Sequence, residues 1–89
     1  MEEFSLQHQG LNIHVYKSGA GAIPLVLLHG AGLDSAMLSW AEVMAALPER
    51  YTAYAIDMLG YGKSDKPLGL SGTSFYPRHL DCLEDILSQ

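Results

Sequence analysis

The chain has 89 residues, of which 48% are hydrophobic and 17% are charged, and its formal net charge is −5. This length is enough for one small domain over residues 1–89, and the composition is too apolar for a disordered segment. Five Lys and Arg residues scattered along an acidic chain make nucleic acid a poor partner, because phosphate binding needs clustered positive charge.

The cysteine content and the N-terminal residues favour a cytoplasmic location. Cys82 is the single cysteine, so an internal disulfide framework is excluded. The chain opens Met1-Glu2-Glu3, without the basic residues and the apolar stretch of a secretory signal. Its longest apolar stretch, residues 22–28, is far shorter than the roughly 20 residues that span a bilayer. We therefore expect no membrane partner.

The first third of the chain predicts strands. Residues 3–9 and 11–17 alternate between apolar and polar side chains, and Gly10 separates them. This pattern predicts two antiparallel strands joined by a tight turn. A third strand is predicted over about residues 24–29, which include four consecutive aliphatic side chains at 25–28. A run without alternation is typical of a parallel strand buried on both faces.

A helix is predicted over about residues 36–47, ending before a proline. Its apolar face is expected, from helical spacing, at Trp40, Val43, Met44 and Leu47. Ser39 and Glu42 have the spacing of a capping box, although Asp34 or Ser35 could begin an earlier turn.

A second buried strand is predicted over about residues 51–57, which completes a β-α-β unit. Four glycines and a proline between residues 58 and 72 predict a long surface loop. A last helix is predicted over about residues 74–88, capped by Ser74. Its apolar stripe is expected at Tyr76, Leu80, Leu83 and Leu87. The fold class is therefore α/β, with a β-hairpin followed by a parallel β-α-β unit and a terminal helix.

Two turns that follow the predicted parallel strands carry residues suited to catalysis. The first is His29-Gly30-Ala31-Gly32, and the second has the pattern D-x-x-G-x-G-x-S-D-x-P over residues 57–67. Open α/β sheets bind ligands at the carboxyl ends of such strands. Glycines in the first turn let backbone N–H groups approach an oxygen that gains negative charge during acyl transfer.

With these turns in this order, the chain resembles the N-terminal part of the α/β-hydrolase superfamily across nearly all of its length. The second turn matches the family pattern at Asp57, Gly60, Gly62, Ser64, Asp65 and Pro67. The resemblance implies that the Ala31 N–H is one oxyanion-hole donor, in a turn shaped by His29, Gly30 and Gly32. It also implies that His29 braces the turn and is not the general base.

The superfamily's nucleophile elbow, G-x-S-x-G, does not occur in the chain. In family terms the elbow, the acid and the base would all follow Gln89. The last predicted helix runs into Ser88-Gln89 without a glycine, a proline or a basic last turn, so it is expected to be interrupted there. Cys82 has no flanking glycine and is better interpreted as a small, half-buried helix residue than as a nucleophile.

Asp57, at the end of a predicted strand, has a catalytic and a structural interpretation, and the structural one is favoured. The resemblance implies that Asp57 holds the 60–62 loop by accepting backbone N–H bonds, and Asp also commonly does this at turns.

Three side chains are candidates for lining a substrate crevice, although apolar residues beside a sheet more often belong to the core: Met37, Met58 and Tyr61.

No cofactor and no metal is predicted. Gly62-Lys63-Ser64 imitates the end of a phosphate-binding loop, but that pattern requires glycine where the chain has Asp57. Gly60 and Gly62 lack the third glycine of a dinucleotide fingerprint. The four histidines show no close metal-ligand spacing.

The sequence leaves two functions open. In the first, the chain is an N-terminal fragment of a cofactor-free hydrolase that acts on an ester or related bond, carbon–carbon bonds included, in a small-molecule substrate. Epoxide hydrolases and haloalkane dehalogenases often have proline where this chain has Gly32, which disfavours these two classes without excluding them. In the second, the chain is a noncatalytic truncated module whose apolar strand edge at 25–28 pairs with another chain, self-association included.

Overall fold

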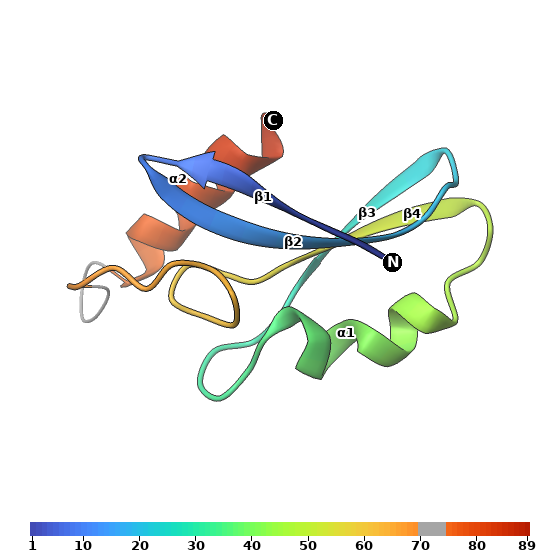
Figure 1. Ribbon diagram of the computed structural model, residues 1–89, viewed down its shortest axis with the longest axis horizontal. Coiled ribbons are helices and arrows are strands. Elements are labelled where there is room, and N and C mark those ends of the chain that lie inside the picture. The colour runs from blue at the N-terminus through green and yellow to red at the C-terminus, as the bar shows by residue number, and fades with distance from the viewer. Residues whose placement is uncertain (70–74) are drawn as a thin grey trace.

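The computed structural model describes residues 1–69 and 75–89 and forms one four-stranded sheet with a helix on each face (Figure 1). The elements in chain order are β1 (Glu2–His8), β2 (Leu11–Gly19), β3 (Ile23–Leu28), α1 (Ala36–Ala45), β4 (Tyr51–Ile56) and α2 (Phe75–Leu87). The strand order is β1-β2-β4-β3, with β2 antiparallel to both of its neighbours and β3 parallel to β4. The predicted fold class is confirmed.

The hairpin of β1 and β2 forms where the alternation predicts it. Gln9 and Gly10 have φ values of 49° and 78°, the left-handed conformation that a two-residue hairpin loop requires. The register pairs Phe4 with Val15 and Leu6 with Ile13, so the apolar side chains of both strands lie on one face.

Each face of the sheet has its own core. On the α2 face the buried cluster consists of Ile13, Val15, Ile56, Leu59, Cys82 and Ile86. On the α1 face it consists of Tyr16, Ala36, Met44, Ala53 and Ala55. The two small side chains of β4 allow α1 to pack closely on the centre of the sheet. The helix crossover therefore brings the ends of β3 and β4 together at one edge.

The start of α1 differs from the capping-box prediction, and one residue of its predicted apolar face is exposed. Ser35 is the N-cap, and its hydroxyl accepts a hydrogen bond from the Leu38 N–H at 3.3 Å. Ser39 lies inside the helix and donates to Asp34 instead of capping. Val43, expected in the core, is 46% exposed, because the side of α1 that contacts the sheet is the one that carries Ala36 and Met44.

The predicted apolar stripe of α2 is wrong. Three of its four residues are exposed: Tyr76, Leu80 and Leu87. The buried face carries His79, Cys82 and Ile86, with Leu83 packed beside it. Both sets have helical spacing, and the helix docks by the second set because it contacts Ile13 and Ile56 of the sheet. The predicted cap, Ser74, lies outside the described residues.

A hydrogen bond from the hairpin fixes the position of α2. His8, which is buried at the end of β1, has its Nδ1 2.8 Å from the Asp85 carboxylate.

In the described part of the chain, no helix is long and apolar enough to cross a membrane.

The prediction that β3 is buried on both faces is also wrong for this chain. Among the described strands, β3 lies at an edge of the sheet and pairs only with β4. Leu25 and Leu27 pack toward α1, whereas Val26 and Leu28 on the other face are 44% and 40% exposed. Val26 lines an apolar groove of about 370 Å³ beside the C-terminal end of α2. The apolar run therefore has one covered face and one open face.

The docking of α2 can be tested with two adjacent residues. Ile86 is 4% exposed and Leu87 is 58% exposed. We expect Ile86→Ala to lower the free energy of unfolding by about 2–4 kcal/mol, because it leaves a cavity in the core. Leu87→Ala is the control, with an expected change of about 0.5 kcal/mol or less. Urea denaturation followed by circular dichroism measures both, and equal losses would mean that α2 docks by the other face.

Candidate functional site

The first turn, residues 29–34, leaves the end of β3 and is braced by His29. The Nε2 atom of this side chain accepts a hydrogen bond from the Met58 N–H at 3.0 Å. Its Nδ1 atom lies 2.7 Å from the Gly30 carbonyl oxygen, so the proton is on Nδ1. Both ring nitrogens are therefore occupied, and the imidazole joins the end of β3 to the residue that follows β4 and Asp57.

Two backbone N–H groups of this turn donate hydrogen bonds within the protein, and a third between them does not do so among the described residues. The Gly30 N–H donates to the Asp34 carboxylate at 2.8 Å, and the Gly32 N–H donates to the Tyr61 hydroxyl at 3.3 Å. The Ala31 N–H, which lies between them, has no acceptor among the described residues. A free N–H group in a fixed turn is available to an oxygen of a ligand.

Asp34 fixes the turn to the start of α1. Its carboxylate accepts hydrogen bonds from the Ser35 N–H, the Ser39 hydroxyl and the Gly30 N–H, each at 2.8–2.9 Å. These bonds, that from Ser35 above all, lower the pKa of Asp34 below its ordinary value. Gly32 has φ 86°, which few other residues adopt, and this conformation closes the turn.

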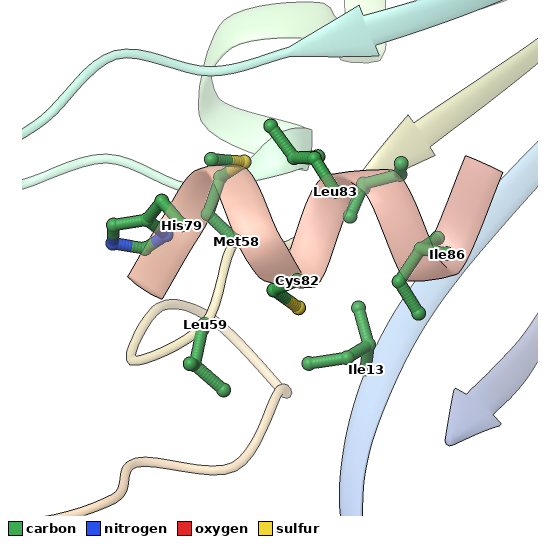
Figure 2. Close-up of a pocket in the computed structure, with 8 residues that line it drawn as sticks. Ile13, Met58, Leu59, His79, Cys82, Leu83 and Ile86 are labelled. Carbon is green, nitrogen blue, oxygen red and sulfur yellow. The ribbon is translucent and has the colours of Figure 1, made fainter. Parts of the chain in front are cut away.

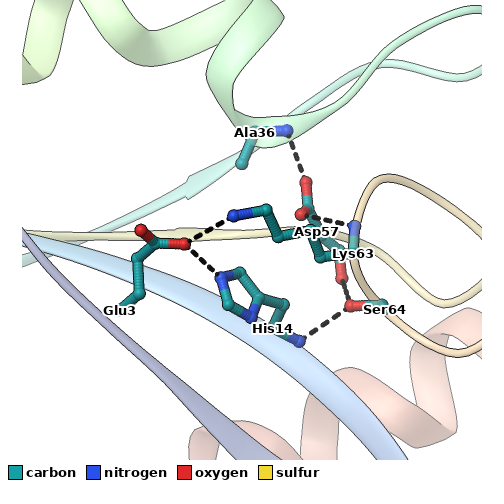
Figure 3. Close-up of polar contacts among 6 residues, drawn as sticks. All are labelled: Glu3, His14, Ala36, Asp57, Lys63 and Ser64. Atoms are coloured by element: carbon teal, nitrogen blue, oxygen red, sulfur yellow. Dashed lines mark hydrogen bonds and ion pairs between the residues drawn. The ribbon is translucent and has the colours of Figure 1, made fainter.

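Asp57, which follows β4, is 1% exposed and joins the second turn to the start of α1 (Figure 3). Its Oδ1 accepts from the Ala36 N–H at 2.8 Å, and its Oδ2 accepts from the Lys63 N–H at 3.0 Å. The bond to Lys63 ties down the second turn, one residue beyond the 60–62 segment. The bond to Ala36 was not predicted, because nothing in the sequence indicates that the two residues meet.

The second turn is held against the hairpin. The Ser64 hydroxyl accepts from the His14 N–H at 2.8 Å and donates to the Asp57 carbonyl oxygen at 2.6 Å. Asp65 accepts from the Asn12 N–H at 2.8 Å. Leu59 is fully buried in the α2-face core. The segment is therefore part of the packed structure, and its description as a surface loop is correct only for part of its length.

A surface ion-pair cluster lies beside this turn (Figure 3). The Glu3 carboxylate is 2.9 Å from the Lys63 Nζ and 2.8 Å from the His14 Nε2. These partners, Lys63 first, lower the pKa of Glu3, and Glu3 in turn raises the pKa of Lys63. Exposed pairs of this kind stabilise proteins only slightly.

A cavity of about 130 Å³ opens between the first turn and the start of α2. It is lined by His29, Gly30, Ala31, Met58, Tyr61, Phe75, Tyr76 and His79. Two of the three predicted crevice residues, Met58 and Tyr61, lie in this lining. The third, Met37, lies on α1 and packs against the α1-face cluster. The structure therefore brings the first turn and two of the three candidates together.

Sequence reasoning missed the three lining residues at the start of α2, which are Phe75, Tyr76 and the buried His79. Figure 2 shows the His79 imidazole near the start of α2, close to Met58. In the sequence, this histidine precedes Cys82 by three residues, which places both on one face of a helix. That spacing could predict a buried histidine only if the buried face of α2 were already known. Burial, first among the causes, lowers the pKa of His79.

The described residues hold no cluster of three metal-ligating side chains. Cys82 lies in the core under α2 (Figure 2), and burial raises the pKa of its thiol to about 11. A thiol with this pKa is scarcely ionised at neutral pH and is a poor nucleophile.

Comparison with known proteins gives one consistent result. A family model described as alpha/beta hydrolase fold matches residues 23–89. The chain is 41% identical over 59 residues to a soluble epoxide hydrolase of Corynebacterium sp. (strain C12), covering 66% of this chain and 20% of that protein. It is 37% identical over 75 residues to the pimeloyl-[acyl-carrier protein] methyl ester esterase of Legionella pneumophila (strain Corby), covering 84% and 29%.

The solved structures agree with the sequence matches. Haloalkane dehalogenase DatA from Agrobacterium tumefaciens C58 superimposes with a TM-score of 0.78 at 26% identity, over 98% of this chain and 29% of that one. The chain thus spans less than a third of the length of these relatives.

Glycine at position 62 can be tested against a second glycine with positive φ. A β-carbon at Gly62 would overlap the Asp57 carboxyl, whereas one at Gly10 meets nothing within 4 Å. Both substitutions to Ala carry the left-handed backbone cost of about 1–2 kcal/mol. We expect Gly62→Ala to lower the free energy of unfolding by at least about 1 kcal/mol more than Gly10→Ala, because it also displaces a buried carboxylate. Thermal or urea unfolding gives the difference, and equal losses would contradict the packing of this turn.

Proposed function

Because the chain belongs to the alpha/beta hydrolase fold family, we propose that it forms the N-terminal part of a cofactor-free hydrolase and supplies one oxyanion-hole donor, the Ala31 N–H. The nucleophile, the acid and the base would come from polypeptide outside these 89 residues. The first turn and the cavity beside it would form one wall of the active site.

The observation that carries this proposal is that the Ala31 N–H has no acceptor within residues 1–69 and 75–89. Its neighbours in the turn, Gly30 and Gly32, already donate to protein acceptors. When a nucleophile attacks a carbonyl group, the carbonyl oxygen gains negative charge, and an N–H group already in place stabilises it without reorganisation. His29 would not be the general base, because both of its ring nitrogens are occupied within the fold.

The proposed substrate is a small molecule with an ester, or with a carbon–carbon bond next to a carbonyl. Both reactions place negative charge on an oxygen, which is what the Ala31 N–H can stabilise. The relatives include hydrolases of both kinds, a methyl ester esterase and a 2-hydroxy-6-oxo-2,4-heptadienoate hydrolase, and also an epoxide hydrolase. We further infer a cytoplasmic location, because the single cysteine is a free thiol.

The test uses a complete domain in which this chain is continuous with a nucleophile elbow, assayed with p-nitrophenyl esters. We expect Ala31→Pro, which removes the N–H, to lower kcat about 10²–10³-fold. Ala31→Ser keeps the N–H and is the control, with kcat within a few-fold of the unchanged protein. Circular dichroism and unfolding curves show whether the proline variant is folded. The 89 residues alone should have no turnover.

Absence of turnover in a complete, folded domain with an intact elbow would contradict the hydrolase assignment. Full activity of a folded Ala31→Pro variant would contradict only the role of this N–H group.

The open edge of β3 favours a second candidate, a noncatalytic module that pairs with a second copy of itself. β3 has one paired neighbour, and its exposed side chains include Ile23, Val26 and Leu28. Unpaired backbone groups along an apolar strand are a template for another strand. Two copies could join β3 to β3 across a twofold axis, because such an interface is self-complementary.

Sedimentation equilibrium of the 89-residue chain tests this candidate. We expect a dimer at high concentration, and Val26→Lys should shift the chain toward monomer, because a charge at an edge strand opposes pairing. The control is Leu33→Lys, which adds the same charge at a fully exposed position away from the sheet edge. A monomer at all concentrations would count against the module.

A further inference from the structure

His79 is a buried side chain that makes ring contacts but no hydrogen bond within the described part of the chain. The residue is 5% exposed, and neither of its ring nitrogens has a hydrogen-bond partner within the described residues. Buried polar groups in native proteins are nearly always paired, so an exception of this kind requires an explanation. The imidazole lines the cavity that opens at the first turn, which makes a ligand the natural partner.

The surroundings keep this imidazole neutral. Burial is the first cause that lowers its pKa, followed by the charges of His29 and Arg78. Among the described residues, no carboxylate lines the cavity. A neutral imidazole has one N–H donor and one acceptor nitrogen. A hydroxyl group can satisfy either, whereas the described lining residues offer a metal ion no acidic side chain.

The other walls are suited to one aromatic ring. The Phe75 ring contacts the His79 ring edge-on, with the ring centroids 4.6 Å apart. The centroid of the Tyr61 ring lies 6.2 Å from that of His79 and 4.8 Å from that of His29. Met58 and Tyr76 complete the apolar lining. A volume of about 130 Å³ is close to that of cavities that hold one benzene molecule, about 150 Å³. Aromatic side chains also contact a ring ligand in favourable offset or edge-on geometries.

We propose that His79, with the rings of Phe75 and Tyr61, forms a binding site for a single hydroxyl-bearing aromatic ring of the phenol class, next to the Ala31 N–H. The ring lies in the cavity, and its hydroxyl exchanges a hydrogen bond with the His79 imidazole. As a statement about substrate class this rests on the proposed function, because it makes the substrate a ring-bearing ester or ketone. The binding itself requires no catalysis.

The test compares p-cresol with toluene, which has the same ring and methyl group without the hydroxyl. Both are titrated into the chain, and the ¹⁵N and ¹³C resonances of the histidine rings are followed by NMR. We expect p-cresol to shift the His79 ring resonances and to bind about five- to tenfold more tightly than toluene, the value of one net hydrogen bond.

Two variants complete the test. His79→Phe keeps a ring in the same place, and it should bind toluene but lose the preference for p-cresol. The control is Leu80→Ala on the exposed side of α2, which should keep the preference. Equal binding of the two ligands, a preference that survives in His79→Phe, or no binding of either would overturn the site.

The outcome is separable from that of the proposed function. A complete domain that hydrolyses esters through Ala31 but shows no preference for p-cresol would retain the function and lose this site. An inactive complete domain that binds p-cresol through His79 would do the reverse.

Discussion

The buried carboxylate of Asp57 is the interaction on which the arrangement of this site depends. Burying a carboxylate is costly unless hydrogen bonds replace its water, and here two backbone N–H groups do so. One belongs to Ala36 at the start of α1 and the other to Lys63 in the second turn. A single side chain at the end of β4 therefore holds the helix start and the second turn in place, and Gly62 is the residue that leaves room for it.

The hydrogen bonds around Asp57 and Asp34 also decide which backbone groups remain for a ligand. Asp34 takes the Gly30 N–H, Tyr61 takes the Gly32 N–H, and His29 uses both ring nitrogens within the fold. The Ala31 N–H, which lies at the cavity, has no acceptor in the described part of the chain. A turn that is fully bonded on both sides of one N–H group presents that group in a fixed direction, which is the condition for electrostatic stabilisation without reorganisation.

The two faces of the sheet are covered unequally, and this bears on both candidate functions. α1 packs on the centre of one face, whereas α2 covers the other face mainly over the hairpin and leaves Val26 and Leu28 exposed. The exposed residues of α2 include the apolar side chains Tyr76, Leu80 and Leu87. Covering this exposed apolar surface, by another polypeptide segment or by a second copy, would be favourable because it removes apolar area from water.

The sequence by itself determined the hairpin, the β-α-β order and the two glycine-containing turns. These features depend on neighbours along the chain: period-two alternation, a glycine at a tight turn, and an apolar run before a turn. The tertiary structure alone decided that α2 docks through Cys82 and Ile86, that Ser35 and not Ser39 caps α1, and that His79 faces a cavity. Helical spacing fits more than one face of a helix, so contacts with distant residues such as Ile13 and Asp57 select among them.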